Sequence, residues 1–261
     1  MSRHPPVVII GAGVGGLTLA LALRRRGIGA EILEQSTELR EVGAAVALAA
    51  NGTRLLRVLR LGGCLARVST KPTRMVHRDG RDGHVVAATQ GPGWYRDAFG
   101  APFFGLHRAA LQRLLAGAVG PDYLHLGCRV EVLEQTRWGV GVRCSSGAAA
   151  DAGVVVGADG VHSLSRDWVT GCDEPVYSGT SGFRGLVPAG QLSQMPDSGA
   201  LQFWMGPGAH LLHYPISGGK LINFLAVVDE PEHWTGPGWM EPLSLARTSR
   251  HLPDGTPRSQ S

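Results

Sequence analysis

The residues with the clearest chemical meaning form a glycine-rich segment close to the N-terminus. Gly11, Gly13 and Gly16 give the pattern Gly-x-Gly-x-x-Gly directly after the apolar run Val7–Ile10, and Gly15 lies inside the same pattern. Glycines in this arrangement permit a tight turn, the close approach of a pyrophosphate and close packing of the helix that follows. The N-terminus of that helix directs positive potential at the phosphates. The pattern therefore predicts a loop that binds the pyrophosphate of a dinucleotide.

An acidic residue further along the chain supports this prediction. Glu34 ends the apolar run of residues 30–33, roughly 20 residues after the glycines, where a carboxylate accepts hydrogen bonds from an adenosine ribose. The alternative is a glycine-rich turn with an unrelated glutamate on the surface. The order of strand, glycine turn, helix and strand is that of a βαβ unit and favours the binding loop. This pattern does not distinguish a nicotinamide cofactor from a flavin.

The helices that position these residues follow from the apolar periodicity and its stop signals. We expect a helix over residues 17–26, directly after the glycine turn, and a helix over residues 107–119. We also expect a helix over residues 51–61, which Asn51 caps and which the pair Gly62-Gly63 ends. Each of these helices is bounded by residues that are typical of caps or turns.

Strand patterns dominate the rest of the chain. Alternating apolar residues around Asp-Gly and other turn signals indicate hairpins within residues 75–86 and within residues 129–142, and residues 182–228 read mainly as strands. The sequence therefore predicts an α/β fold, in which a Rossmann-like nucleotide-binding domain carries an inserted β-rich domain.

The expected domains are discontinuous in sequence. We assign residues 1–70 and 100–170 to the nucleotide-binding domain, and residues 71–99 and 171–238 to the β-rich domain. Residues 239–261 are rich in Pro, Ser, Arg and Thr and have no apolar periodicity. We therefore expect this tail not to pack.

The composition argues against several classes of protein. Hydrophobic residues make up 43% of the 261 residues, charged residues make up 18%, and the mean hydropathy is +0.02, which is typical of a globular chain without membrane spans. The formal net charge of +4 comes from arginines that are spread along the chain, so no nucleic-acid partner is expected. The four cysteines lie far apart in the sequence, which indicates neither a metal site nor a redox pair and fits a reducing cytoplasm.

Three further segments point to the cofactor through a family resemblance. The segments are residues 38–51, residues 106–115 and residues 154–166, the last of which contains Gly157-Ala-Asp-Gly160 with Ser163 and Arg166. Together they resemble the FAD-dependent aromatic-ring monooxygenases of the salicylate and para-hydroxybenzoate hydroxylase group. The resemblance extends from about Val7 to about Trp239.

This resemblance implies FAD as the cofactor, with NADH or NADPH as the co-substrate. It implies that Arg40 and Arg108 contact the FAD phosphates and the ribityl region, a role that suits a guanidinium group. It also places Asp159, with Gly160, near the pyrophosphate. Taken singly, the arginines could instead be solvated charges at helix ends, and Asp159 could belong to an ordinary turn. The expected cofactor-binding set is Gly11, Gly13, Gly15, Gly16, Glu34, Arg40, Arg108, Asp159 and Gly160.

The later strands resemble the substrate domain of the same family. Residues 203–216 and 219–224 look like the sheet whose inner face lies over the flavin ring. By this resemblance His213 and Tyr214 would orient a phenolic substrate, and Arg184 would hold a carboxylate. The alternative is that these side chains are ordinary core or edge residues of a sheet, as most such residues are.

The activity that the resemblance implies is hydroxylation of a small phenolic substrate with NAD(P)H and O₂, by a cytoplasmic monomer or homodimer. Family members continue into a third flavin motif, a Gly-Asp pair followed by Ala-Ala-His, which this sequence lacks. We therefore expect little or no hydroxylase activity from this chain alone, and a truncated, catalytically silent FAD-fold fragment is the alternative. A nicotinamide-dependent dehydrogenase is a third possibility, but it would need a second catalytic domain that the sequence does not indicate.

Overall fold

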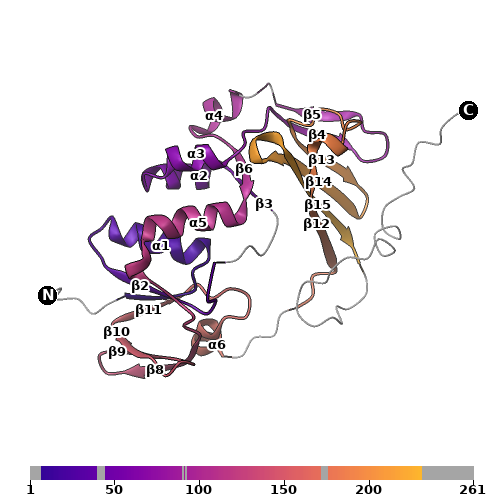
Figure 1. Cartoon of the computed structure of the whole chain (residues 1–261). Helices are drawn as coiled ribbons and strands as arrows, with labels where there is room; N and C mark the ends of the chain where they lie inside the picture. Colours follow the sequence, from indigo (N-terminus) through magenta and orange to yellow (C-terminus); the bar gives the residue numbers. More distant parts are fainter. Residues whose placement is uncertain (1–6, 40–44, 90, 92, 172–175, 231–261) are drawn as a thin grey trace, which may run out of the picture.

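The computed structural model describes residues 7–39, 45–89, 91, 93–171 and 176–230. These residues form two halves, an α/β half and a half built on one broad sheet, with the short paired strands β3 (Ala45–Leu48) and β6 (Phe104–His107) between them (Figure 1). Arg40 and the tail of residues 239–261 lie outside the described residues. Across the described ranges, no helix has both the length and the apolar character that a membrane span requires.

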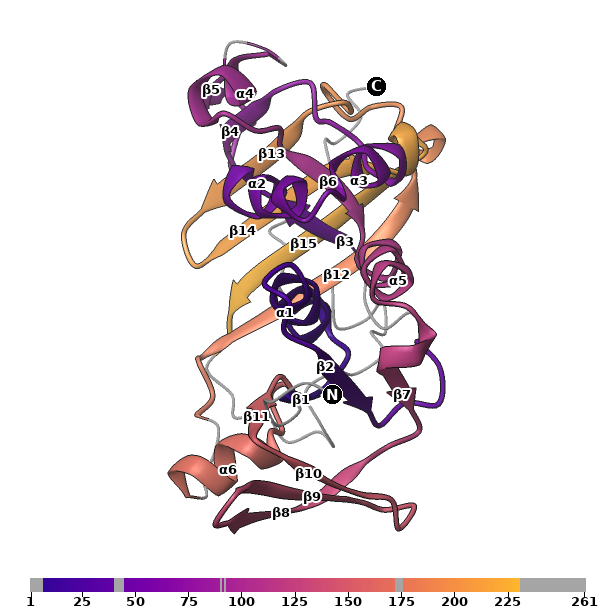
Figure 2. The same cartoon turned by 90° about the vertical axis from the view of Figure 1, so that its left-hand side faces the viewer.

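The α/β half is centred on a parallel sheet with the strand order β11-β1-β2-β7. Its helices lie against one face, and a separate antiparallel sheet lies against the other (Figure 2). The strand β1, between β11 and β2, is covered on both sides, so its residues form a continuous apolar run instead of an alternating pattern. The elements are β1 (Val7–Ile10), α1 (Val14–Arg24), β2 (Ala30–Glu34), α5 (Arg108–Val119), β7 (Leu124–Leu126), β8 (Val130–Thr136), β9 (Gly139–Cys144), β10 (Ala149–Ala152) and β11 (Val154–Gly157).

Strand β1 shows how the two layers share one sheet. Ile9 is fully buried on the helix side, together with Leu17 of α1 and Leu115 of α5. Its neighbours Val8 and Ile10 point to the opposite side and pack in the cluster that contains residues of β8 and β9. This alternation follows from the period of two in a strand, and it lets β1 contribute to both hydrophobic clusters.

Helix α1 begins at Val14, earlier than residue 17, where the sequence predicts its start. Gly13 is its N-cap, with an extended backbone at φ −68° and ψ 176°. Gly15 and Gly16 therefore lie in the first turn of α1, and only the first part of the glycine pattern forms the turn between β1 and the helix.

The helix predicted over residues 51–61 is α2 (Ala50–Val58), and a second helix that the sequence analysis did not predict, α3 (Gly62–Val68), follows it. Asn51 is not the cap of α2, because the carbonyl group of Ala49 accepts the first hydrogen bonds of the helix. Ala50 is buried, so packing sets where the helix begins. The pair Gly62-Gly63 does not end α2, which stops at Val58 with Leu59 as its C-cap, but forms the start of α3.

The second half is a six-stranded sheet with the order β12-β15-β14-β13-β4-β5. Neighbouring strands are antiparallel except β13 and β4, which are parallel. Residues 75–88 thus join this broad sheet and not the parallel one. The division of the chain into two discontinuous domains stays a prediction. The strands are β4 (Met75–Asp79), β5 (Val85–Ala88), β12 (Thr180–Pro188), β13 (Leu201–Gly206), β14 (Ala209–Ile216) and β15 (Leu221–Asp229), and the remaining helices are α4 (Trp94–Phe99) and α6 (Leu164–Thr170).

One face of the broad sheet points toward the α/β half, and we call it the inner face. Leu201 and Tyr214 are buried on it and pack with Ala45 and Ala47 of β3. Because side chains alternate along a strand, every second residue of β14 belongs to this face and the others belong to the outer face. The inner face is therefore the part of the sheet that can meet a ligand held by the α/β half.

Two cysteines that lie far apart in the sequence are neighbours in the fold. The pairing of β8 with β9 brings the thiol of Cys128 within hydrogen-bonding reach of the Cys144 thiol. Burial of the group, followed by the proximity of Cys128, raises the pKa of Cys144 above its usual value. Sequence separation alone therefore gave no indication of this pair, and both residues are free thiols.

Candidate nucleotide site and the facing sheet

The glycine loop of residues 11–16 needs two of its glycines for packing. Gly11 has φ +105°, and a Cβ atom placed on it would lie 2.4 Å from the carbonyl oxygen of Ala158, in the turn after β11. A Cβ on Gly16 would lie 2.0 Å from the carbonyl oxygen of Gly11. Both distances are far below van der Waals contact, so any side chain at these positions would force the loop away from β11 or α1.

The other two glycines of the loop leave space for a ligand. A Cβ on Gly13 or Gly15 would meet no atom within 4 Å. Both residues lie at the N-terminus of α1, where the first backbone N–H groups have no partner within the helix. The first turn of α1 contains no acidic residue. This end of α1 therefore presents open N–H donors and positive potential, which is the chemistry that binds phosphate groups.

Glu34 lies directly beside this loop. One of its carboxylate oxygens accepts a hydrogen bond of 2.7 Å from the N–H of Ala12, and the other accepts a bond of 2.9 Å from the N–H of Ser36. These bonds hold the carboxylate at the carboxyl end of β2. Each oxygen retains a further lone pair, so the group can still accept a hydrogen bond from a ribose hydroxyl.

Gln112 of α5 also fixes the loop, and the sequence analysis missed it. Its side-chain amide donates a 2.8 Å hydrogen bond to the carbonyl oxygen of Ala12. Gln112 follows Arg108 by one helical turn, so the two side chains lie on the same side of α5. That spacing is the signal that could have identified it. Arg108 itself is the first residue of α5 and is exposed.

Asp159 belongs to the turn between β11 and α6 and lies against the glycine loop, since its Cα would be 3.2 Å from a Cβ placed on Gly11. Its carboxylate accepts hydrogen bonds from Ser163 Oγ at 2.6 Å and from the N–H and Oγ of Ser165 at 3.0 and 3.1 Å. Burial alone would raise the pKa of Asp159, but these hydrogen bonds outweigh it, so the pKa lies below its usual value. The carboxylate is therefore ionised at neutral pH.

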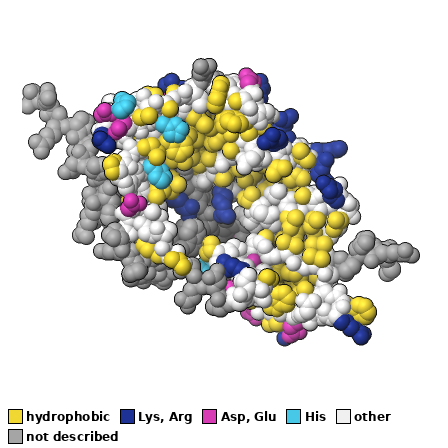
Figure 3. Space-filling model, turned by 180° about the vertical axis from the view of Figure 1, so that it is seen from behind, with side chains coloured by type: hydrophobic (Ala, Val, Ile, Leu, Met, Phe, Trp, Pro, Cys, Tyr) yellow, Lys and Arg dark blue, Asp and Glu magenta, His cyan; other side chains and the backbone are white. Residues whose placement is uncertain are grey.

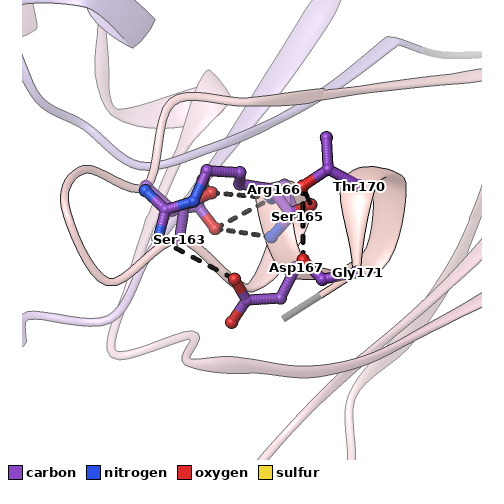
Figure 4. Close-up of polar contacts among 7 residues, drawn as sticks. Ser163, Ser165, Arg166, Asp167, Thr170 and Gly171 are labelled. Carbon is purple, nitrogen blue, oxygen red and sulfur yellow. Dashed lines mark hydrogen bonds and ion pairs between the residues drawn. The ribbon is translucent and has the colours of Figure 1, made fainter. Parts of the chain in front are cut away.

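The serines that hold Asp159 also organise the start of α6 (Figure 4). Ser163 is the N-cap of α6, and its Oγ accepts a hydrogen bond of 2.9 Å from the N–H of Arg166. Gly157 permits this arrangement, because a Cβ on it would lie 2.4 Å from the Cβ of Ser165. Gly160, with φ +82°, completes the turn. Asp159 thus has a structural role at this corner in addition to any contact with a ligand.

The inner face of the broad sheet carries two of the residues expected to contact a substrate. Tyr214 is 3% exposed and packs on β6, where a Cβ on Gly105 would lie 2.7 Å from the tyrosine ring. Burial raises the pKa of Tyr214 to about 12, so the phenol stays protonated. Arg184 of β12 pairs with Leu225, which in turn pairs with Leu212 of β14, two residues before Tyr214. Arg184 therefore lies on the same face as Tyr214, and it is exposed.

The inner face also carries a polar residue for which the sequence analysis gave no role. Asn223 lies opposite Tyr214 in the pairing of β14 with β15 and is 4% exposed. Its amide oxygen has no hydrogen-bond partner among the described residues. Figure 3 shows a hollow between the two halves, with Lys and Arg side chains on its walls.

His213 lies on the outer face and does not share a surface with Tyr214. Its Nε2 accepts a hydrogen bond of 2.9 Å from the indole N–H of Trp204. Burial, and then the positive charge of Arg78, lowers the pKa of His213 to about 4, so the imidazole is neutral at pH 7. The structure therefore brings Tyr214 and Arg184 to one face and separates His213 from both.

Comparisons with known proteins show the family to which the chain is similar. A family model described as an FAD binding domain matches residues 4–220. The chain is 37% identical over 238 residues to 3-amino-4-hydroxybenzoate 2-monooxygenase of Streptomyces cremeus, covering 91% of this chain and 60% of that protein. It is 31% identical to 3-hydroxybenzoate 6-hydroxylase 1 of Aquipseudomonas alcaligenes, covering 88% of this chain and 60% of that protein.

Among solved structures, the chain resembles Klebsiella pneumoniae HpxO complexed with FAD and uric acid. The TM-score is 0.79 at 28% sequence identity, and the match covers 90% of this chain and 59% of that one. The chain thus spans about 60% of the length of the curated relatives that it matches.

Proposed function

This chain belongs to the FAD-binding aromatic hydroxylase family, and on that premise we propose that it provides the FAD-binding half and the substrate-facing sheet of a monooxygenase. The reaction is hydroxylation of a small phenolic compound with NAD(P)H and O₂. The observation that carries the proposal is the meeting of the glycine loop, Glu34 and Asp159 at the carboxyl ends of β1, β2 and β11. Ligands of open α/β sheets bind at this edge.

The residues of this edge fit an FAD molecule. The open space over Gly13 and Gly15, at the N-terminus of α1, fits the pyrophosphate. Glu34 fits the adenosine ribose, because its carboxylate is already oriented toward the loop by Ala12 and Ser36. When bound, FAD supplies the electron transfer from the nicotinamide and the activation of O₂. The protein residues bind and orient it, and Glu34 and Gln112 hold the loop through the backbone N–H and carbonyl groups of Ala12.

The inner face of the broad sheet fits the role of a substrate wall. The protonated Tyr214 phenol can donate a hydrogen bond to the oxygen of a phenolic substrate. Arg184, on the same face, can pair with a carboxylate such as that of a hydroxybenzoate. The partly buried side chains of Leu212 and Phe203 pack against the cluster that contains Tyr214 and add apolar surface to this face. We therefore assign substrate positioning to Tyr214 and Arg184 and not to His213.

The proposal is tested by incubating the 261-residue chain with FAD and either NADH or NADPH, and then adding phenols and hydroxybenzoates one at a time. The proposed function predicts that at least one compound stimulates nicotinamide oxidation and appears as a hydroxylated product by mass spectrometry. That outcome would overturn the expectation, drawn from the sequence, of little or no hydroxylase activity from this chain alone. Arg184→Gln should raise the KM for a hydroxybenzoate by about tenfold and leave that for a phenol without a carboxylate unchanged. The same rise for both compounds would contradict the assignment of Arg184.

A second candidate is a chain that binds FAD without turnover. The observation that favours it is that the matched regions make up about 60% of each curated relative, so part of each relative has no counterpart in the match. For this candidate we expect FAD to bind with no oxidation of the nicotinamide above the rate of free flavin. A hydroxylated product from this chain would exclude it.

A further inference from the structure

An open cavity lies away from the glycine loop, among α2, α3, α4 and β6. Its volume is about 530 Å³, which is within the range of small-molecule sites. The floor includes the buried side chains of Leu65 and Phe104 and the half-buried Pro102. Four cationic residues line its walls, Arg57, Arg60, Lys71 and Arg96, and we call it the cationic pocket.

The charge of the cationic pocket is not balanced by its own lining. The lining contains no aspartate or glutamate. Within the part of the chain that the structure describes, no carboxylate forms an ion pair with Arg57, Arg60 or Lys71. The guanidinium of Arg96 lies 3.8 Å from Asp97, but both side chains are exposed and water screens the pair. Lys and Arg side chains gather on the surface over this region (Figure 3).

The backbone at Arg60 is set by the end of α2. Arg60 has φ +63°, in the left-handed region, where glycine or asparagine is favoured over arginine. The N–H groups of Arg60 and Leu61 donate hydrogen bonds of 2.9 Å to the carbonyl oxygens of Arg57 and Leu56, which is a common pattern at the C-terminus of a helix. The position at which a glycine is usual therefore carries a long cationic side chain at the wall of the pocket.

These features select the chemistry of the ligand. Four cations around an apolar floor fit a molecule with an apolar ring and more than one negative charge, which describes an adenosine phosphate better than a benzoate. In nicotinamide sites, a carboxylate binds the free ribose hydroxyls of NADH, whereas arginine binds the 2′-phosphate of NADPH. The cationic pocket has arginines and no carboxylate.

We propose that the cationic pocket binds the adenosine 2′-phosphate end of NADPH, an inference that rests on the proposed function because it concerns the co-substrate of that reaction. Arg57, Arg60, Lys71 and Arg96 surround the phosphates, and the adenine ring lies on the accessible apolar surface of Ala66 and Pro102. The pocket shares elements with the flavin half, since Phe104 belongs to β6, which leads directly into Arg108 at the start of α5. The same chemistry would also accept a free adenosine bisphosphate.

Titration calorimetry of the 261-residue chain with 2′,5′-ADP tests the proposal without FAD or turnover. We expect 2′,5′-ADP to bind about tenfold more tightly than 5′-AMP, because the second phosphate adds charge-assisted hydrogen bonds. Its affinity should fall as salt is raised. Equal affinities for the two nucleotides, or binding of inorganic phosphate or benzoate as tight as that of 2′,5′-ADP, would overturn the proposal.

Matched variants locate the binding. Arg60→Gly removes a cation and relieves the left-handed backbone, so it should weaken 2′,5′-ADP binding by about tenfold without lowering the unfolding midpoint. Arg96→Gln should act in the same direction. Arg54→Gln is the control, because Arg54 is exposed on α2 but does not line the pocket. Loss of binding in Arg54→Gln, or unchanged binding in Arg60→Gly and Arg96→Gln, would show that the nucleotide binds elsewhere.

Measuring FAD affinity with the same variants separates this inference from the proposed function. We expect Arg60→Gly to leave FAD binding unchanged. If Arg60→Gly and Arg96→Gln weaken 2′,5′-ADP binding, the assignment of the pocket holds even when FAD does not bind. In that case only the proposed function fails. Hydroxylation that runs equally well with NADH and with NADPH would overturn the assignment of the 2′-phosphate.

Discussion

The glycine loop and the inner face of the broad sheet are positioned by different kinds of interaction. In the loop, backbone groups make the decisive contacts: the Ala12 N–H donates to Glu34, and the Ala12 carbonyl accepts from Gln112. On the sheet, strand pairing over long sequence distances decides which side chains share a surface. The loop therefore depends on the absence of side chains at set positions, whereas the sheet depends on strand register.

The largest effect that the comparison predicts is on the loop. Gly11→Ala should lower the free energy of unfolding by about 3 kcal/mol, because the new Cβ combines a left-handed backbone with overpacking; the Ala158 carbonyl oxygen lies 2.4 Å away from it. Gly13→Ala is the control, since its Cβ meets no atom within 4 Å. Urea unfolding of both variants measures the difference. Equal losses would mean that close approach does not set the glycine requirement.

On the outer face of the sheet, the largest effect concerns pH. The pKa of His213 is lowered from 6.5 to about 4 in the folded chain, so the unfolded chain binds more protons between these values. The contribution of the neutral His213 to the free energy of unfolding is therefore fully present above pH 6.5. It is lost as the pH drops toward about 4, by at most about 3 kcal/mol at the end of that window. His213→Gln should flatten this part of the profile in urea unfolding at stepped pH. An unchanged profile would contradict the buried, neutral imidazole.

On the inner face, a variant should change ligand recognition more than stability. Tyr214→Phe keeps the ring that packs on Gly105 and removes only the hydroxyl, so we expect kcat/KM for a phenolic substrate to fall about tenfold. The unfolding free energy should change by less than about 1 kcal/mol. Steady-state kinetics and urea unfolding of the same preparation check both statements. A fall in kcat/KM of the same size in His213→Gln would contradict the separation of the two faces.

The smallest effect is expected where the loop meets α6. Asp159→Asn keeps the shape of the side chain but weakens its hydrogen bonds with Ser163 and Ser165, which should cost about 1 kcal/mol of unfolding free energy. Because the pKa of Asp159 is lowered in the folded chain, its contribution is present at neutral pH and is lost as the pH falls through that pKa. Acid unfolding of Asp159→Asn should therefore begin at the same pH as that of the unmodified chain, or at a higher pH. Ser146→Ala, at an exposed turn, is a control that should change neither quantity.

The conformation of the loop could be predicted from the sequence because it depends on the local spacing of glycines. Gly11, Gly16 and Glu34 occupy positions that a pyrophosphate loop requires, and the structure places them together. Gln112 was missed because its contact with Ala12 crosses from α5 to the loop. The start of α2 was wrong because burial of Ala50 overrides the capping preference of Asn51.

The sheet could be predicted only as a set of strands. Adjacent residues such as His213 and Tyr214 necessarily point to opposite faces, but the sequence does not say which face meets the α/β half. That information comes from the packing of Tyr214 against β3 and β6. The proximity of Cys128 and Cys144 was missed for the same reason, since it depends on the pairing of β8 with β9.

The central claim is that the glycine loop, with Glu34 beside it, binds FAD. The most direct measurement is a fluorescence titration of FAD with the purified chain and with Glu34→Arg, with NAD⁺ titrated in parallel. We predict that FAD binds at one molecule per chain, that NAD⁺ does not compete for the loop, and that Glu34→Arg weakens FAD by at least about tenfold. Micromolar binding of NAD⁺ with no binding of FAD would contradict the account.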